Sequence, residues 1–315
     1  MSDLVVSLPS DEGLLEALDG TPGVRLVAWD LDGPPPCERI DIVVPPYWGG
    51  ARRLAALGDE HGPVDVGLVQ WQSIGYNGVE RYLPAGLPLA NATTVHEAST
   101  AELALALALA AQRGLPDFVR AGDEHRWQLR SFPSLADRRV LIVGYGGVGK
   151  AIEARLAGFE VEIARLARRA RKDRSLAGEE TDVRGLDELH DALAAAEIVM
   201  LAVPLGDETR GLIDAAALAA MPDGALLVNV ARGPVVVTDA LVAELQAGRL
   251  RAALDVTDPE PLPAEHPLWS CPNVLISPHV GGDSSAMMPR MCALILRQIE
   301  HVRAGEQPEN LVDLP

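Results

Sequence analysis

A short apolar strand that runs into a glycine-rich turn constrains this chain most. The run Val140 to Val143 is followed by Gly144-Tyr145-Gly146-Gly147-Val148-Gly149, which matches the pattern G-x-G-x-x-G. The first glycine of this pattern permits a tight turn, the second lets the backbone approach a pyrophosphate, and the third lets the next helix pack closely on its strand. The pattern predicts a dinucleotide site at the N-terminus of a helix, whose amides can bind phosphate.

Basic residues stand where an acidic residue usually marks a preference for NAD. In NAD sites an Asp or Glu about 20 residues after the first glycine bonds the ribose hydroxyl. We expect the corresponding strand, Val161 to Ala164, to end at Arg165, with Arg168 and Arg169 just beyond. Guanidinium groups suit the 2′-phosphate of NADP. We therefore expect NADP(H) to be preferred over NAD(H), and Arg165→Asp to shift the preference toward NADH; the alternative is that these arginines form a solvated basic face.

Composition limits the classes of partner and compartment. The 315 residues, 48% of them hydrophobic, suffice for two domains. A net charge of -18 argues against nucleic acid and anionic membrane surfaces as partners. Three cysteines without C-x-x-C spacing, and no closely spaced histidine ligands, argue against a disulfide framework and a metal site. Because the start of the chain lacks the features of a signal peptide, we expect a cytoplasmic protein.

The order of apolar segments predicts an α/β fold with two domains. A doubly wound parallel sheet is expected in a dinucleotide-binding domain over residues 96–282, because apolar strands there alternate with helices. Its strands are expected near Val140 and Val161 and at Ile198 to Val203, Leu226 to Val230, Ala252 to Val256 and Val274 to Ser277. A smaller, flavodoxin-like α/β substrate domain is expected over residues 1–95 and 283–315. Its strands are expected at Leu4 to Ser7, Val24 to Ala28, Ile40 to Val44 and Val66 to Gln70.

Two helices are expected at the domain boundaries. Ser99-Thr100-Ala101-Glu102 matches a capping box and predicts a helix over Leu103 to Gln112, which Gly114 and Pro116 would end. A second helix, over about Ser285 to Arg303, would return the chain to the first domain.

An arginine, a carboxylate and a histidine follow successive predicted strands. Ligands of such a sheet bind outside the carboxyl ends of its strands, so Arg232, Glu260 and His279 are expected at one edge. Protonated His279 would give a proton to a carbonyl oxygen, while Glu260 would favour that protonated form and fix its tautomer. Arg232 would bind the substrate carboxylate and polarise the ketone. These roles suit hydride transfer to a 2-keto acid. Asp255, at another strand end, could bond either the backbone or a carboxamide.

The chain resembles the D-isomer-specific 2-hydroxyacid dehydrogenases over nearly its whole length. The motifs that carry the resemblance are the glycine-rich turn and the segments Asn229 to Val236, Leu254 to Pro263 and Ser277 to Gly282. The resemblance implies the same catalytic arginine, glutamate and histidine, and a homodimer formed through the cofactor domain. It also implies a substrate loop at Ser73-Ile74-Gly75 and cofactor contacts at Gly147, Val148, Val203, Pro204, Thr209, Ala231, Asp255 and Gly281.

Two positions bear on specificity within this family. The family usually has Asp where Arg165 stands, so the chain is more similar to the NADP-linked glyoxylate/hydroxypyruvate reductases. Formate dehydrogenases of the same fold carry glutamine in the Glu-His pair, so Glu260 favours reduction of a ketone. Two alternatives stay open: a dinucleotide-sensing, corepressor-like interaction protein, and a phosphite or phosphoglycerate dehydrogenase. The identity of the 2-keto acid and the physiological direction also stay open.

Overall fold

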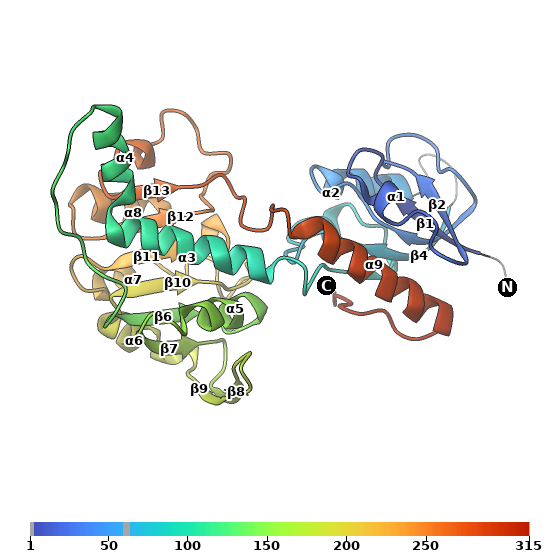
Figure 1. Cartoon of the computed structure of the whole chain (residues 1–315). Coiled ribbons are helices and arrows are strands. Elements are labelled where there is room, and N and C mark those ends of the chain that lie inside the picture. The colour runs from blue at the N-terminus through green and yellow to red at the C-terminus, as the bar shows by residue number, and fades with distance from the viewer. Residues whose placement is uncertain (1–2, 59–63, 315) are drawn as a thin grey trace. The chain divides into compact units, whose positions relative to one another are not determined.

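A computed structural model describes residues 3–58 and 64–314 and divides the chain into two compact units (Figure 1). Unit 1 comprises Met1–His96 and Ser284–Pro315, and unit 2 comprises Glu97–Asp283. Each unit contains a parallel sheet packed against helices. The chain is therefore an α/β protein, as the sequence predicted.

Unit 2 is built on a six-stranded parallel sheet in the order β13-β12-β11-β10-β6-β7. Its strands are short and mostly apolar, as is typical of strands covered on both faces. They are β6 (Arg139–Val143), β7 (Glu162–Leu166), β10 (Ile198–Leu201), β11 (Leu226–Asn229), β12 (Arg251–Leu254) and β13 (Val274–Ile276). All six strands expected from the sequence are present, and they lie side by side in one sheet.

Alternate residues of these strands point into two hydrophobic cores on opposite faces of the sheet. Leu141 and Leu227 belong to one core, and Ile142 and Val228 belong to the other. The first core includes side chains of α6 (Leu189–Ala195), α7 (Ala215–Ala220) and α8 (Thr238–Gln246), and the second those of α3 (Glu97–Arg113) and α5 (Gly147–Leu156). With both faces covered, the loops after the strands are left for a ligand.

The helix that opens unit 2 begins earlier than predicted. Ser99 and Thr100 were expected to precede α3, but they lie inside it and are buried. Gly114 ends α3 in the left-handed conformation, as expected. Pro116 does not stop helical structure, because proline is tolerated in the first turn of a helix, and α4 (Leu115–Asp123) begins at once. Among the described residues, no helix combines the length and apolar character needed to cross a bilayer.

A hairpin that the sequence analysis did not predict follows β7. It consists of β8 (Arg171–Arg174) and β9 (Glu180–Val183), which pair in antiparallel orientation and carry mostly charged, exposed side chains. Arg184, just after β9, forms a parallel bridge with Leu166. The hairpin therefore lies beside the β7 edge of the sheet (Figure 1).

Unit 1 contains a five-stranded parallel sheet in the order β2-β1-β3-β4-β5, which is the flavodoxin-like order. The expected strands appear as β1 (Leu4–Leu8), β2 (Val24–Ala28), β3 (Arg39–Val43) and β4 (Asp65–Gln70), and the short β5 (Leu89–Ala90) was missed. One core of this unit contains side chains of α9 (Met287–Ala304), close to the late helix that the sequence predicted.

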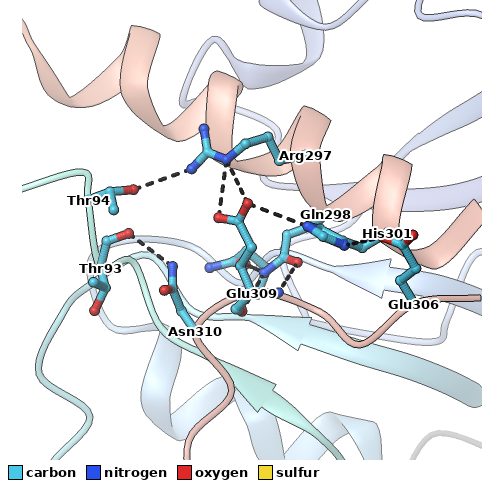
Figure 2. A network of polar contacts seen from close by, with 9 residues as sticks. Thr93, Thr94, Arg297, Gln298, His301, Glu306, Glu309 and Asn310 are labelled. Atoms are coloured by element: carbon cyan, nitrogen blue, oxygen red, sulfur yellow. Dashed lines mark hydrogen bonds and ion pairs between the residues drawn. The ribbon is translucent and has the colours of Figure 1, made fainter. Parts of the chain in front are cut away.

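A network of polar contacts joins α9 to the C-terminal segment (Figure 2). Arg297 Nε donates to both carboxylate oxygens of Glu309, at 3.0 and 3.1 Å. Gln298 exchanges hydrogen bonds of 2.9 Å with the backbone N–H and carbonyl of Glu309, and donates to buried Gln70 at 2.7 Å. Leu311 forms an antiparallel bridge with Ala90 of β5. The C-terminal segment thus covers one edge of this sheet.

Candidate active site

The glycine-rich turn of unit 2 has the geometry of a dinucleotide cradle. Gly144 has a φ of 104°, and a Cβ there would overlap the carbonyl oxygen of Ala202. A Cβ at Gly149 would overlap the carbonyl oxygen of Gly144, so α5 packs tightly against the end of β6. A Cβ at Gly146 would instead meet no atom within 4 Å. The turn is therefore open beside Gly146, where a pyrophosphate can approach the backbone.

The other predicted cofactor residues follow neighbouring strands of the same sheet. Thr209 is held close to Pro204, because its Oγ1 donates to the Pro204 carbonyl at 2.6 Å. Gly147 and Val148 open α5, Arg168 and Arg169 follow β7, Val203 and Pro204 follow β10, Ala231 follows β11, Asp255 follows β12, and Gly281 follows β13. Because all these strands are parallel, the residues share the carboxyl-end edge of the sheet, and the edge suits an extended dinucleotide.

Arg165 lies elsewhere than the sequence analysis expected. The strand was predicted to end at Arg165, but β7 continues through Leu166, so that Arg165 stands inside it. Its guanidinium donates to both carboxylate oxygens of Glu153 on α5, at 2.9 Å from Nε and 2.6 Å from Nη2. The strand end is instead followed by Ala167, Arg168 and Arg169, of which both arginines are exposed. The expected strand end at Arg165 was wrong, because pairing with β6 extends the strand by one more residue, Leu166.

The predicted histidine and glutamate are brought together. His279 Nδ1 forms a hydrogen bond with Glu260 Oε1, although the two residues are 19 positions apart. Both side chains are 38% exposed, so the pair is accessible to a ligand. With Nδ1 held by the carboxylate, Nε2 is the ring nitrogen that can exchange a proton with a substrate. His279 has a φ of 57°, an uncommon conformation for a residue other than glycine.

Asp255 holds the loop that carries this histidine. Its buried carboxylate accepts hydrogen bonds from Ser277 Oγ at 2.6 Å, Val280 N at 3.0 Å and Gly281 N at 2.9 Å. Its carbonyl accepts a further hydrogen bond from His279 N at 2.7 Å. Of the two roles considered for Asp255, the geometry favours bonding to the backbone, and this bonding fixes the position of His279.

Arg232 follows β11 and is half-buried. Its Nη1 donates to the Ala231 carbonyl at 2.6 Å. The side chain of Asn229, which is 1% exposed, bonds the backbone of the loop after β11. Its Oδ1 accepts from Ala231 N at 3.0 Å, and its Nδ2 donates to the Arg232 carbonyl at 3.2 Å. The sequence analysis gave Asn229 no role of its own. A polar side chain ending an otherwise apolar strand was the signal that could have identified it.

The predicted substrate loop, Ser73-Ile74-Gly75, lies in unit 1 after β4. All three of its carbonyl oxygens accept hydrogen bonds within that unit. The donors are Ala92 N to Ser73 at 3.0 Å, Asn91 Nδ2 to Ile74 at 3.0 Å, and Trp71 Nε1 to Gly75 at 2.9 Å. The loop backbone is therefore held in place by its carbonyl groups.

Comparison with known proteins identifies the family to which this chain is similar. The family model described as "D-isomer specific 2-hydroxyacid dehydrogenase, NAD binding domain" matches residues 105–281. A glyoxylate reductase from Pyrococcus furiosus is 35% identical over 258 residues, which cover 78% of this chain and 75% of that protein. A D-3-phosphoglycerate dehydrogenase from Methanocaldococcus jannaschii is 30% identical over 240 residues. The chain spans only 58% and 45% of the length of the first curated relatives that it matches.

Solved structures resemble the chain over nearly its whole length. A D-isomer-specific 2-hydroxyacid dehydrogenase from Xanthobacter autotrophicus Py2, in complex with NADPH and MES, is 30% identical with a TM-score of 0.78. An NADPH-dependent glyoxylate/hydroxypyruvate reductase from Sinorhizobium meliloti, in complex with NADP and sulfate, is 25% identical with a TM-score of 0.81. In both cases the match covers 99% of this chain and 98% of the other.

Proposed function

The chain belongs to the D-isomer-specific 2-hydroxyacid dehydrogenase family, and on that premise we propose that it reduces short 2-keto acids of the glyoxylate or hydroxypyruvate type, preferring NADPH. One observation carries this proposal. The His279–Glu260 pair and Arg232 follow adjacent parallel strands at the edge that also holds the glycine-rich turn. A proton donor, a cation and a dinucleotide cradle thus share one edge of the sheet.

Each side chain has a role that follows from its contacts. Glu260 holds His279 Nδ1, so His279 gives a proton to the substrate oxygen through Nε2, or takes one in the reverse direction. Arg232 binds the substrate carboxylate and polarises its ketone. The amides of Ser73, Ile74 and Gly75 are proposed to bind a substrate carboxylate, and the hydrogen bonds to the carbonyls of that loop support this by holding its backbone in place. A bound nicotinamide would supply or accept the hydride.

The proposed NADPH preference rests on the residues after β7. Ala167 is buried there and its methyl side chain cannot bond a ribose hydroxyl, whereas Arg168 and Arg169 are exposed. Arg168 has a side chain that is 68% exposed, and its Nε lies 3.8 Å from Glu208, a loose surface pair that a phosphate can displace. The NADPH and NADP complexes of the two structural relatives support the same preference.

We also propose that the protein acts as a homodimer in the cytoplasm. The proposed dimer surface is the segment after α4, where Trp127 and Leu129 are 92% and 87% exposed. Large apolar side chains exposed together favour burial against another protein surface. The three cysteines are free thiols, which suits a reducing compartment.

Steady-state kinetics test the proposal. The ratio kcat/KM is measured for NADPH and NADH with glyoxylate and hydroxypyruvate, in the wild type and in the double variant Arg168→Ala/Arg169→Ala. Removing two charge-assisted contacts to the 2′-phosphate should lower the NADPH value by about 100-fold and change the NADH value little. Arg174→Ala, at an exposed arginine of the neighbouring β8–β9 hairpin, is the control. A wild type that prefers NADH would refute the proposed preference.

The same assay includes the second candidate function. Relatives named D-3-phosphoglycerate dehydrogenase are 30% and 31% identical, although the chain spans less than half of each. Efficient oxidation of 3-phosphoglycerate, without turnover of glyoxylate, would favour that function. Binding of NADP(H) without turnover of any 2-keto acid would instead favour the corepressor-like alternative.

A further inference from the structure

We propose that Tyr145, Glu153 and Arg165 form a brace that fixes the glycine-rich turn and sets the affinity of unit 2 for dinucleotides in general, without distinguishing NADPH from NADH. The three residues come from different elements: the turn itself, α5 and β7. The inference rests on the dinucleotide site of the proposed function but is independent of its cofactor preference.

The contacts within the brace leave little freedom to its members. Glu153 receives two hydrogen bonds from Arg165 and a third from the Tyr145 hydroxyl, which shares Oε2 with Arg165 Nε. The arginine and glutamate side chains are only 19% and 12% exposed, and Tyr145 is 1% exposed. A bidentate arginine-carboxylate pair has a fixed geometry. The tyrosine hydroxyl is therefore held against Glu153 of α5.

The ionisation states of the brace are stable around neutral pH. Burial opposes ionisation of Glu153, but hydrogen bonds from Arg165 and Tyr145 outweigh it and hold the carboxyl pKa below its ordinary value. Burial and the hydrogen bond to Glu153 raise the pKa of Tyr145 to about 12. Glu153 therefore stays charged and Tyr145 stays protonated, so the hydroxyl remains a donor wherever the enzyme is assayed near pH 7.

The brace acts on the backbone that would meet the pyrophosphate. Tyr145 lies between Gly144 and Gly146, so fixing its side chain fixes the peptides on both sides. Its carbonyl accepts a hydrogen bond of 2.9 Å from Arg171 of the β8–β9 hairpin, and Gly144 N donates to the Leu166 carbonyl at 2.8 Å. Donors that are positioned in advance bind a charged group better than donors that must be ordered on binding. Loosening Tyr145 should therefore weaken phosphate binding.

The same contacts explain why Arg165 should not select between cofactors. Its Nε and Nη2 are bonded to Glu153, and its Nη1 donates to the Ile163 carbonyl at 3.0 Å. The charge of the guanidinium is balanced by the adjacent carboxylate. The pyrophosphate that the turn would bind is common to NADH and NADPH. A weakened brace should consequently reduce the affinity for both dinucleotides by the same factor.

The first test is Tyr145→Phe, which removes the hydroxyl and keeps the buried ring. The Kd values of NADH and NADPH are measured by quenching of protein fluorescence, together with kcat at saturating cofactor and the Tm of the free protein. We expect both Kd values to rise roughly tenfold, the factor that corresponds to one hydrogen bond to a charged group, while kcat stays within about twofold. Tyr82→Phe, which removes a hydroxyl from the surface of unit 1, is the matched control.

The second test compares Arg165→Met with Arg165→Lys. Methionine removes the charge at similar length, whereas lysine restores a single contact to Glu153, so affinity for both dinucleotides should fall further with methionine and recover partly with lysine. If Arg165→Met does not fold, the Kd values of Tyr145→Phe alone decide whether the brace sets the affinity for dinucleotides. Selective loss of NADPH affinity, or unchanged Kd values with a lower Tm, would overturn the inference. The proposed cofactor preference is tested separately, by the ratio of kcat/KM for NADPH to kcat/KM for NADH in the wild type. An equal loss of affinity for both dinucleotides in the variants can be detected whichever cofactor the wild type prefers.

Discussion

At the scale of single residues, Asp255 organises the loop that carries the proposed proton donor, His279. Its carboxylate accepts three hydrogen bonds from the segment between Ser277 and Gly281, and its carbonyl accepts from His279 N. A carboxylate accepts at both oxygens, whereas an amide offers one acceptor oxygen and one NH2 group, which donates. This residue therefore positions His279, while Glu260 fixes the tautomer of its ring.

Asp255→Asn should consequently reduce kcat by about 10- to 100-fold and lower the free energy of unfolding by about 2 kcal/mol, because an amide N–H would face a backbone N–H in a buried site. Steady-state kinetics and urea unfolding measure the two effects. Asp258→Asn, at an exposed aspartate before Glu260, should change neither. A higher Kd for NADPH with normal kcat at saturation would instead assign Asp255 to the nicotinamide carboxamide.

At the scale of secondary-structure elements, the C-terminal segment stabilises unit 1 through side chains of α9 (Figure 2). The hydrogen bonds that Arg297 donates lower the pKa of Glu309 below its ordinary value of 4.5, against the opposing effect of burial, and His301 contributes further. A carboxyl group with a lowered pKa in the folded state stabilises the fold above pH 4.5, and this stabilisation disappears as the pH falls through the lowered value.

Glu309→Gln should therefore destabilise unit 1 by about 1 kcal/mol at pH 7, a modest value because the ion pair is partly exposed. The variant should also lose less stability than the wild type as the pH falls from about 5 through the lowered pKa of Glu309. This difference is measured from the midpoints of urea unfolding at several pH values, with tryptophan fluorescence as the signal. Trp29 and Trp71 are buried in unit 1 and report on its unfolding. Glu306→Gln, which alters the more exposed contact with His301, serves as the control. If the urea midpoints of the wild type and Glu309→Gln changed with pH in the same way, the role of this carboxylate would be refuted.

At the scale of the whole molecule, the apolar surface after α4 bears on the proposed dimer. Trp127 and Leu129 are almost fully exposed, and Val119 on α4 is 64% exposed. Burying such side chains releases about 25 cal/mol for each Å² of apolar surface. A second copy of the chain is the proposed source of that burial.

Light scattering after size-exclusion chromatography should give about twice the chain mass of 33.5 kDa for the wild type. The double variant Trp127→Glu/Leu129→Asp should run as a monomer, because two charges would have to be buried at the interface. Leu176→Asp, at an exposed leucine of the loop between β8 and β9, should leave the mass unchanged. A wild type that is monomeric, or a double variant that stays dimeric, would refute this surface as the interface.

The sequence by itself determined the α/β class, the strands that make both sheets except β5, and the family. These features depend on local information: apolar runs long enough for buried strands, a glycine pattern typical of a dinucleotide-binding turn, and candidate catalytic residues that each follow a strand. The pairing of Glu260 with His279 could be predicted for the same reason, because both residues follow strands that end at one edge.

Only the tertiary structure decided which partner each polar group takes. Arg165 follows the glycine motif at the spacing of a ribose contact, yet β7 continues past it and α5 brings Glu153 against its guanidinium. Asp255 meets donors more than 20 positions away, and the two residues of β5 pair with the C-terminal segment. Hydrogen bonds and ion pairs depend on distances of a few ångström between segments remote in the chain, and local propensity carries no information about those distances.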